Sequence, residues 1–149
     1  MKRRKVKPLE EKSKPELEKE LDKWFSRFIR LRDSDENGFL QCCTCERPFY
    51  WKAVDCGHYS KRNKAHRFNE KNCNGQCRYC NDALKGEADK HAAYIDKKHG
   101  EGTAEFLRGT ENKLRELNRF EYIELVKEYK QKTKDEANKR GINIYDPIP

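Results

Sequence analysis

The stretch of sequence that decides the fold is residues 42–81, which read CCTCERPFYWKAVDCGHYSKRNKAHRFNEKNCNGQCRYCN. It opens with the pair Cys42 and Cys45 and closes with the pair Cys77 and Cys80. A C-x-x-C pair can place two thiolates on one tight turn, and two such pairs complete the tetrahedral four-sulfur set of a structural zinc site. The spacing therefore predicts one Zn²⁺ bound by these four cysteines, which closes the long loop between the pairs.

The alternative to zinc is a set of unrelated buried thiols or of disulfides. Paired spacing in a chain with no apolar stretch typical of a signal peptide favours metal over disulfides. The other three cysteines, Cys43, Cys56 and Cys73, lie outside the pairs, and we expect them to pack as small hydrophobic side chains. Because Cys43 lies inside the first pair, it could exchange roles with Cys42 or Cys45.

The spacer between the two cysteine pairs and the end of the stretch carry candidate chemistry. His58 ends a β-prone run, and Asn81 directly follows the last cysteine of the second pair. With Asn72 between them, these residues have the layout of the HNH motif of nucleases. A neutral imidazole can take a proton from water, and a divalent cation can offset the charge that builds on a scissile phosphate. Alone, His58 or Asn81 would be an ordinary polar residue; together with the zinc ligands, they predict a nuclease centre.

At these residues the sequence resembles the NinG (Rap) recombination proteins of lambdoid phages, over roughly residues 9–140. The matching residues are Asp55, Gly57, His58 and Tyr59, then residues 67–72 without Lys71, then Gln76, Cys77, Cys80 and Asn81. The resemblance implies a structure-specific DNA endonuclease that acts on branched recombination intermediates such as Holliday junctions and D-loops. More distantly, the chain is similar to phage endonuclease VII, which also has four zinc cysteines with an asparagine directly after the last one.

The same resemblance implies a fold and a set of roles. The fold is α+β, with a small zinc-stabilised ββα-metal (HNH-like) core and flanking long helices. His58 is then the general base, Asn81 a ligand of a catalytic Mg²⁺ or Mn²⁺, and Asn72 a brace for the loop. The chain departs from the pattern at Gly57, where many such nucleases have an acidic metal ligand. Asp55, about 6.6 Å further back along the strand, could replace that ligand because Gly57 leaves space, or it could simply cap a hairpin.

The composition limits the size of the core and suggests a polyanionic partner. Of the 149 residues, 34% are hydrophobic and 40% are charged, so metal binding would supply folding free energy that apolar burial cannot. We expect one domain with helical extensions. The net charge of +8 favours a polyanionic partner such as DNA, and the absence of a long apolar run predicts a cytoplasmic protein that does not enter a membrane. The resemblance to NinG implies a phage or prophage protein in a bacterial host. The expected parts are a basic tail (1–12), a nuclease domain (13–141) with core 39–98 and helical extensions 13–33 and 103–140, and an irregular tail (142–149).

A run of cations follows His58 directly. Such a run is usually a solvated face, but beside a phosphate-cleaving centre it can contact the DNA backbone. The candidate DNA-binding residues are Lys61, Arg62, Lys64, His66 and Arg67.

The pattern of apolar residues predicts the remaining elements. Ser13 with Glu16 predicts the start of a helix that runs to about Arg32, and Asn118 predicts the start of the last long helix. Between them we expect a hairpin of residues 49–51 with 53–56, a helix at 81–98 and a short helix at 103–108. We expect His91 on this helix and His99 at its C-terminal end to be surface residues and not metal ligands.

The two long helices raise the question of assembly. Their apolar stripes could pair two copies of the chain into a homodimer, which would supply two centres for two cuts, or they could pack on each other within one chain. For function, the alternative to an endonuclease is a non-catalytic, zinc-stabilised nucleic-acid-binding module in which His58 and Asn81 are structural.

Overall fold

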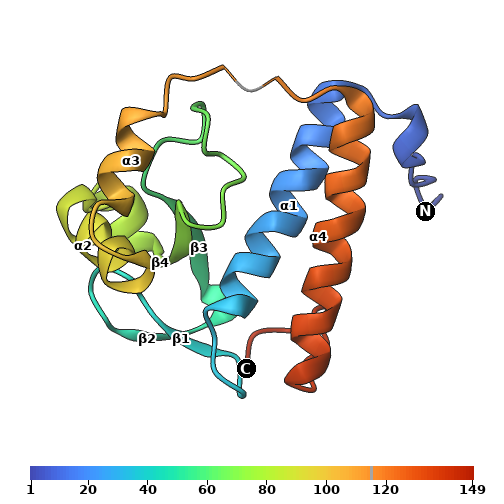
Figure 1. Ribbon diagram of the computed structural model, residues 1–149. Helices are drawn as coiled ribbons and strands as arrows, with labels where there is room; N and C mark the ends of the chain where they lie inside the picture. Colours follow the sequence, from blue (N-terminus) through green and yellow to red (C-terminus); the bar gives the residue numbers. More distant parts are fainter. Residues whose placement is uncertain (115) are drawn as a thin grey trace.

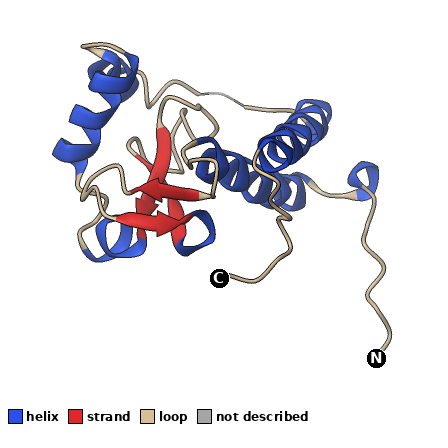
Figure 2. Ribbon diagram, turned by 90° about the horizontal axis from the view of Figure 1, so that it is seen from below, coloured by secondary structure: helices blue, strands red, loops and turns tan. Residues whose placement is uncertain are grey.

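The computed structural model describes residues 1–114 and 116–149; Arg115, which falls within the expected helical extension 103–140, lies outside the described residues. The fold is α+β, as the sequence predicts, and its small strands lie between a pair of long helices and a pair of shorter ones (Figures 1 and 2). The long helices are α1 (Lys14–Arg32) and α4 (Arg119–Lys139), and the shorter ones are α2 (Ala88–His99) and α3 (Thr103–Gly109). The strands are β1 (Phe39–Gln41), β2 (Pro48–Tyr50), β3 (Val54–His58) and β4 (Cys73–Cys77), and the short helical turns are η1 (Leu9–Glu11), η2 (Trp51–Ala53) and η3 (Tyr79–Ala83).

The two long helices lie side by side, with α1 between α4 and the strands (Figure 1). Both begin at the predicted caps: the Ser13 hydroxyl accepts from the Glu16 amide, and Asn118 forms a complete capping box. The rings of Phe25 and Tyr129 meet edge to face, with centroids 5.0 Å apart. The apolar stripes of α1 and α4 therefore cover each other within one chain, so a homodimer would need a different surface.

The ends of the chain pack against this helix pair. Arg119 donates to the carbonyl oxygens of Glu10 and Lys12, both at 2.8 Å, which fixes η1 beside the start of α4. After α4, the Ile142 amide donates to the Ala137 carbonyl at 3.0 Å, and the Ile142 and Ile144 side chains pack on the core.

The four strands form two separate antiparallel pairs, β1 with β2 and β3 with β4. The predicted hairpin of residues 49–51 with 53–56 is wrong, because η2 turns the chain between β2 and β3. The partner of β3 is β4, and its register places His58 opposite Cys73 and Val54 opposite Cys77. The centre of β4 is Asn-Gly-Gln, which has low β-propensity, so its sequence gives no strand signal.

The predicted helix at 81–98 is also divided. A π-helical turn, η3, follows the second cysteine pair, and α2 begins only at Ala88. Between them Lys85, Gly86 and Glu87 have positive φ angles of 53°, 88° and 48°, which break the helix. The buried Gln76 amide donates to the Gly86 carbonyl at 2.9 Å and holds this turn against β4.

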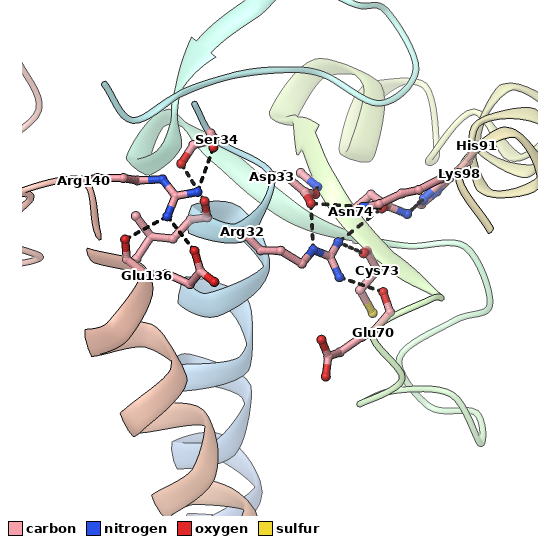
Figure 3. A network of polar contacts seen from close by, with 12 residues as sticks. Arg32, Asp33, Ser34, Glu70, Cys73, Asn74, His91, Lys98, Glu136 and Arg140 are labelled. Atoms are coloured by element: carbon pink, nitrogen blue, oxygen red, sulfur yellow. Dashed lines mark hydrogen bonds and ion pairs between the residues drawn. The ribbon is translucent and has the colours of Figure 1, made fainter. Parts of the chain in front are cut away.

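A polar network joins the end of α1 to β4 (Figure 3). The Arg32 guanidinium donates to the carbonyls of Glu70 and Cys73 at 2.9 and 2.8 Å. The Asp33 carboxylate accepts from Arg32 Nε at 2.8 Å and from the Gly75 amide at 2.7 Å. Because these bonds use the backbone of β4 and of the loop before it, they position the strand that carries Cys73 and Cys77.

His91 continues this network, and its predicted surface position is wrong. The side chain is fully buried, with Nε2 3.1 Å from the Asn74 side-chain nitrogen and the ring edge to face with Tyr59. Burial lowers the pKa of His91 to about 4, so the ring is neutral and Nε2 can accept from Asn74. Lys98 from the same helix donates to the Asn74 side-chain oxygen at 3.3 Å. These bonds attach α2 to β4.

Candidate metal centre and active-site cleft

The four predicted zinc ligands come together from distant parts of the chain. Their Sγ atoms all lie within 4.8 Å of one another, and those of Cys45 and Cys77 are 3.8 Å apart. With zinc–sulfur bonds of about 2.3 Å, a tetrahedral site has sulfur–sulfur edges of about 3.8 Å. All seven cysteines are free thiols. The set therefore fits a structural Zn²⁺ with no ligand position left open.

Backbone amides point at these sulfur atoms. The Cys77 amide donates to Cys42 Sγ at 3.3 Å, and the Cys80 amide donates to Cys77 Sγ at 3.4 Å. Between the two candidates Cys42 and Cys43, the geometry places Cys42 in the cluster. A hydrogen bond from the Cys43 thiol lowers the pKa of Cys42, which favours the thiolate form that binds metal.

A polar cleft of about 720 Å³ runs along β3, between α1 and η3. His58, Asp55 and Asn81 all line it. β3 supplies the first two residues, and η3, which also carries the zinc ligand Cys80, supplies the third. The cysteine centre therefore fixes Asn81 relative to β3.

The imidazole of His58 is fixed by backbone carbonyls. Nε2 lies 2.9 Å from the Arg67 carbonyl oxygen, and Nδ1 lies 3.2 Å from the Cys56 carbonyl oxygen. Burial lowers the pKa of His58, so the ring is neutral and carries one N–H at neutral pH. Since a carbonyl can only accept, the shorter contact favours the tautomer with the proton on Nε2 and Nδ1 unprotonated.

Asp55 and Asn81 touch each other in the cleft. The Asn81 side-chain nitrogen lies 3.2 Å from Asp55 Oδ2, and Arg78 forms an ion pair with Oδ1 at 3.4 Å. Rotation of the Asn81 amide by half a turn would place its oxygen beside the carboxylate, because the two ends of an amide have the same shape. Asp55 and Asn81 can thus offer two oxygen ligands to one Mg²⁺ or Mn²⁺, the type of ligand that these ions prefer.

The sequence interpretation assumed open space beside Gly57. The structure shows that this space is filled. The buried Gln76 side chain fills it, and a Cβ on Gly57 would lie 2.4 Å from Gln76 Oε1. Gln76 also donates to the Thr44 hydroxyl at 3.1 Å, which ties β4 to the first cysteine pair. Glycine is therefore needed at position 57 to make room for Gln76.

Asn72 contacts the backbone of the loop that follows His58. It is fully buried; its oxygen accepts from the Ser60 amide at 2.7 Å, and its nitrogen donates to the carbonyls of Ser60 and His66 at 2.9 and 3.1 Å. Asn72 therefore holds the two ends of the loop together and does not line the cleft.

Comparison with known proteins identifies the family. The family model described as bacteriophage lambda NinG protein matches residues 1–139. The chain belongs to the NinG family. This is a family of phage proteins related to recombination. No curated protein and no solved structure matches the chain. Among the described residues, none of the helices has the length and apolar character needed to span a membrane.

Two of the five candidate DNA-binding residues of this NinG-family chain line the cleft. Lys61 and Arg62 do so with exposed side chains, although Arg62 also pairs with Asp22 at 3.0 Å. Lys64, His66 and Arg67 are half-buried and lie outside the cleft.

The contacts of these three residues hold the loop in place. Lys64 donates to the Asn112 side chain at 2.7 Å, and His66 Nε2 lies 2.7 Å from the Thr110 hydroxyl. Arg67 forms a two-pronged ion pair with Asp22 on α1. The backbone carbonyl of Arg67 contacts His58. The ion pair with Asp22 therefore links the position of His58 to helix α1.

The cleft of the NinG-family chain has further cations that sequence reasoning missed. They come from α1, from η2 and from the region around η3, and only the tertiary fold collects them. One signal was present: Lys19, Lys23 and Arg30 recur at helical spacing, which places them on one face of α1. The missed cations that line the cleft are Lys19, Lys23, Arg30, Lys52, Arg78 and Lys85.

Proposed function

We propose that this NinG-family protein is a divalent-metal-dependent DNA endonuclease that hydrolyses phosphodiester bonds in branched recombination intermediates such as Holliday junctions and D-loops. One observation carries the proposal: a single cleft contains a neutral histidine, an adjacent pair of oxygen-bearing side chains and a cationic rim. A module that only binds nucleic acid would need the rim but not the other two features.

His58 acts as the general base. Its Nε2–H donates to the Arg67 carbonyl, so Nδ1 is the unprotonated nitrogen that accepts a proton from the attacking water. The lowered pKa of His58 keeps the ring unprotonated at neutral pH, so the base is ready without prior deprotonation. Asp22 holds Arg67 and thereby acts as a positioning residue for His58.

Asp55 and Asn81 hold the catalytic cation through the carboxylate and the rotated amide oxygen. Bound there, Mg²⁺ or Mn²⁺ would stabilise the charge that develops on the scissile phosphate and the leaving oxygen. Arg78, whose side chain is 77% exposed, pairs with Asp55 in the free protein and can release it to contact a phosphate.

The cations around the cleft bind the DNA backbone. Lys61 and Arg62 lie on the loop after His58, and Lys19, Lys23 and Arg30 lie on the facing helix α1. A strand in the cleft would therefore have positive charge on both sides. Such contacts orient the backbone without reading its sequence, which suits an enzyme that recognises the shape of a branched substrate.

Resolution of a four-way junction requires two cuts, and the described residues supply one such centre. We therefore propose that two copies act together on a junction as a homodimer. Membership of a recombination-related phage family supports a branched substrate.

The test is cleavage of a labelled four-way junction and of a linear duplex with the same sequence. Each is incubated with the purified protein in Mg²⁺, in Mn²⁺ and in EDTA. We expect cuts in the junction with either metal, much weaker cleavage of the duplex, and none in EDTA.

Matched variants identify the residues. His58→Ala and Asn81→Ala should reduce the cleavage rate about 10²- to 10⁴-fold and keep DNA binding, and Asp55→Ala should show a large loss if it holds the cation. His99→Ala and Asn138→Ala, which make the same changes outside the cleft, should cut at the parent rate. If His58→Ala also cuts at the parent rate, the alternative of a non-catalytic binding module replaces the proposal.

A further inference from the structure

A second group of side chains with the chemistry of metal ligands lies on strands β3 and β4. Cys56, His58 and Cys73 each have a ligand atom within 4.8 Å of the other two. Cys56 and His58 point to the same face of β3 because they are two residues apart, and the register of β4 places Cys73 opposite His58. None of the three belongs to the four-cysteine group.

The chemistry of this triad differs from that of the Asp55 and Asn81 pair. Two thiols and an imidazole are soft ligands that select Zn²⁺ and similar thiophilic ions, whereas carboxylate and amide oxygens suit Mg²⁺ and Mn²⁺. Both cysteines are free thiols. The soft ligands on β3 and β4 therefore differ in chemical type from the hard pair Asp55 and Asn81.

The triad is closed on one side and open on the other. Cys73 is fully buried in the core formed by α1 and α4, with its Sγ 3.7 Å from the Arg67 carbonyl oxygen. Cys56 and His58 line the cleft. Three protein ligands with the fourth position facing solvent is the arrangement of zinc sites that exchange their fourth ligand.

The ligand atoms are close to the spacing that a metal needs. Zinc–sulfur and zinc–nitrogen bonds of about 2.3 and 2.0 Å require tetrahedral ligand atoms about 3.5–3.8 Å apart. The separations of up to 4.8 Å in the triad allow an ion to bind after small side-chain movements, and the half-buried Cys56 and His58 have space on the cleft side.

We propose that Cys56, His58 and Cys73 form a second site for a thiophilic divalent ion such as Zn²⁺, weaker than the four-cysteine site, and that an ion bound there inhibits the enzyme. An imidazole nitrogen that ligates the ion cannot also accept a proton from water. The binding of the ion does not depend on the proposed function; the inhibition of cleavage does.

Binding is tested first, without any activity measurement. The chain is kept reduced with a phosphine, saturated with Cd²⁺ and freed of excess metal by gel filtration; cadmium is then counted by elemental analysis, and the cadmium–thiolate absorption is recorded. We expect two ions per chain for the parent, one for Cys56→Ala and one for His58→Ala. His99→Ala is the matched control for His58→Ala, since His99 belongs to neither group, and it should keep both ions.

The decisive variant must still fold. Cys73 lies in the core and its replacement could unfold the chain, whereas Cys56 is only half-buried, so Cys56→Ala decides. A parent that binds one ion, or a folded Cys56→Ala variant that binds two, overturns the second site.

Inhibition is tested on the junction substrate in constant Mg²⁺. Added Zn²⁺ should slow cleavage by the parent, a chelator selective for Zn²⁺ over Mg²⁺ should restore it, and the ratio of rates with and without Zn²⁺ should return to near one in Cys56→Ala. An unchanged parent rate with the second ion bound overturns the inhibitory role but not the site. If no form of the protein cuts DNA, the proposed function fails, and the cadmium count still decides the site.

Discussion

Replacement of His91, which attaches α2 to β4, tests whether the burial of this neutral histidine makes the stability of the folded chain depend on pH. The side chain is fully buried, its Nδ1 has no hydrogen-bond partner among the described residues, and burial lowers its pKa from 6.5 to about 4. In the unfolded chain the ring takes up a proton below about pH 6.5, while in the folded chain it stays neutral down to about pH 4. Stability is therefore lost as the pH falls from about 6.5 to about 4.

The size of the effect follows from the two pKa values. The full difference of about 2.5 units corresponds to about 3 kcal/mol, of which about 2 kcal/mol is already lost at about pH 5. For a chain of this length, 2 kcal/mol corresponds to a change of about 4–8 °C in Tm. His91→Gln removes the titration and keeps an acceptor for Asn74.

The assay is thermal unfolding of the parent and of His91→Gln at about pH 8 and about pH 5, with excess Zn²⁺ in every sample. Protonation of the cysteine ligands destabilises both proteins in acid, so the informative quantity is the difference between their pH responses. We expect the parent to lose about 4–8 °C more than the variant between these two pH values. Equal losses would refute the argument that buried His91 is neutral in the folded chain.

Three other predictions follow from the site and the helix packing. Cys80→Ser should lose the tightly held zinc and unfold the centre, since zinc binding supplies folding free energy; elemental analysis and circular dichroism check this, and full thermal stability without metal would contradict it. Gly57→Ala should destabilise the fold by about 1–3 kcal/mol, measured by urea unfolding, because the new Cβ would meet Gln76. In sedimentation with and without junction DNA, two copies should assemble at least on the junction; a strict monomer that makes uncoupled single nicks would remove the homodimer and keep the endonuclease.

The sequence by itself determined the features that depend on local chemistry. Two C-x-x-C pairs identified the four thiols that meet in the structure, because each pair needs only one tight turn. The caps at Ser13 and Asn118 located the starts of α1 and α4, because a capping side chain bonds an amide only three residues away. The apolar stripes of these helices were also visible, although their periodicity could not say whether each covers the other or a second copy.

Only the tertiary structure decided the features that depend on distant partners. The Asn-Gly-Gln centre of β4 has little strand propensity, and it pairs with β3 because the cysteine centre and the Asp33 bond to Gly75 hold it there. His91 lies on a helix of mostly polar sequence, yet it is buried because Asn74 provides a partner from another element. The lysines and arginine of α1 become part of the cleft, and Cys73 comes to lie beside His58, because the fold brings separate elements together. Sequence spacing records which residues are near along the chain, whereas burial and pairing across elements are set by the sum of many long-range contacts that no single segment contains.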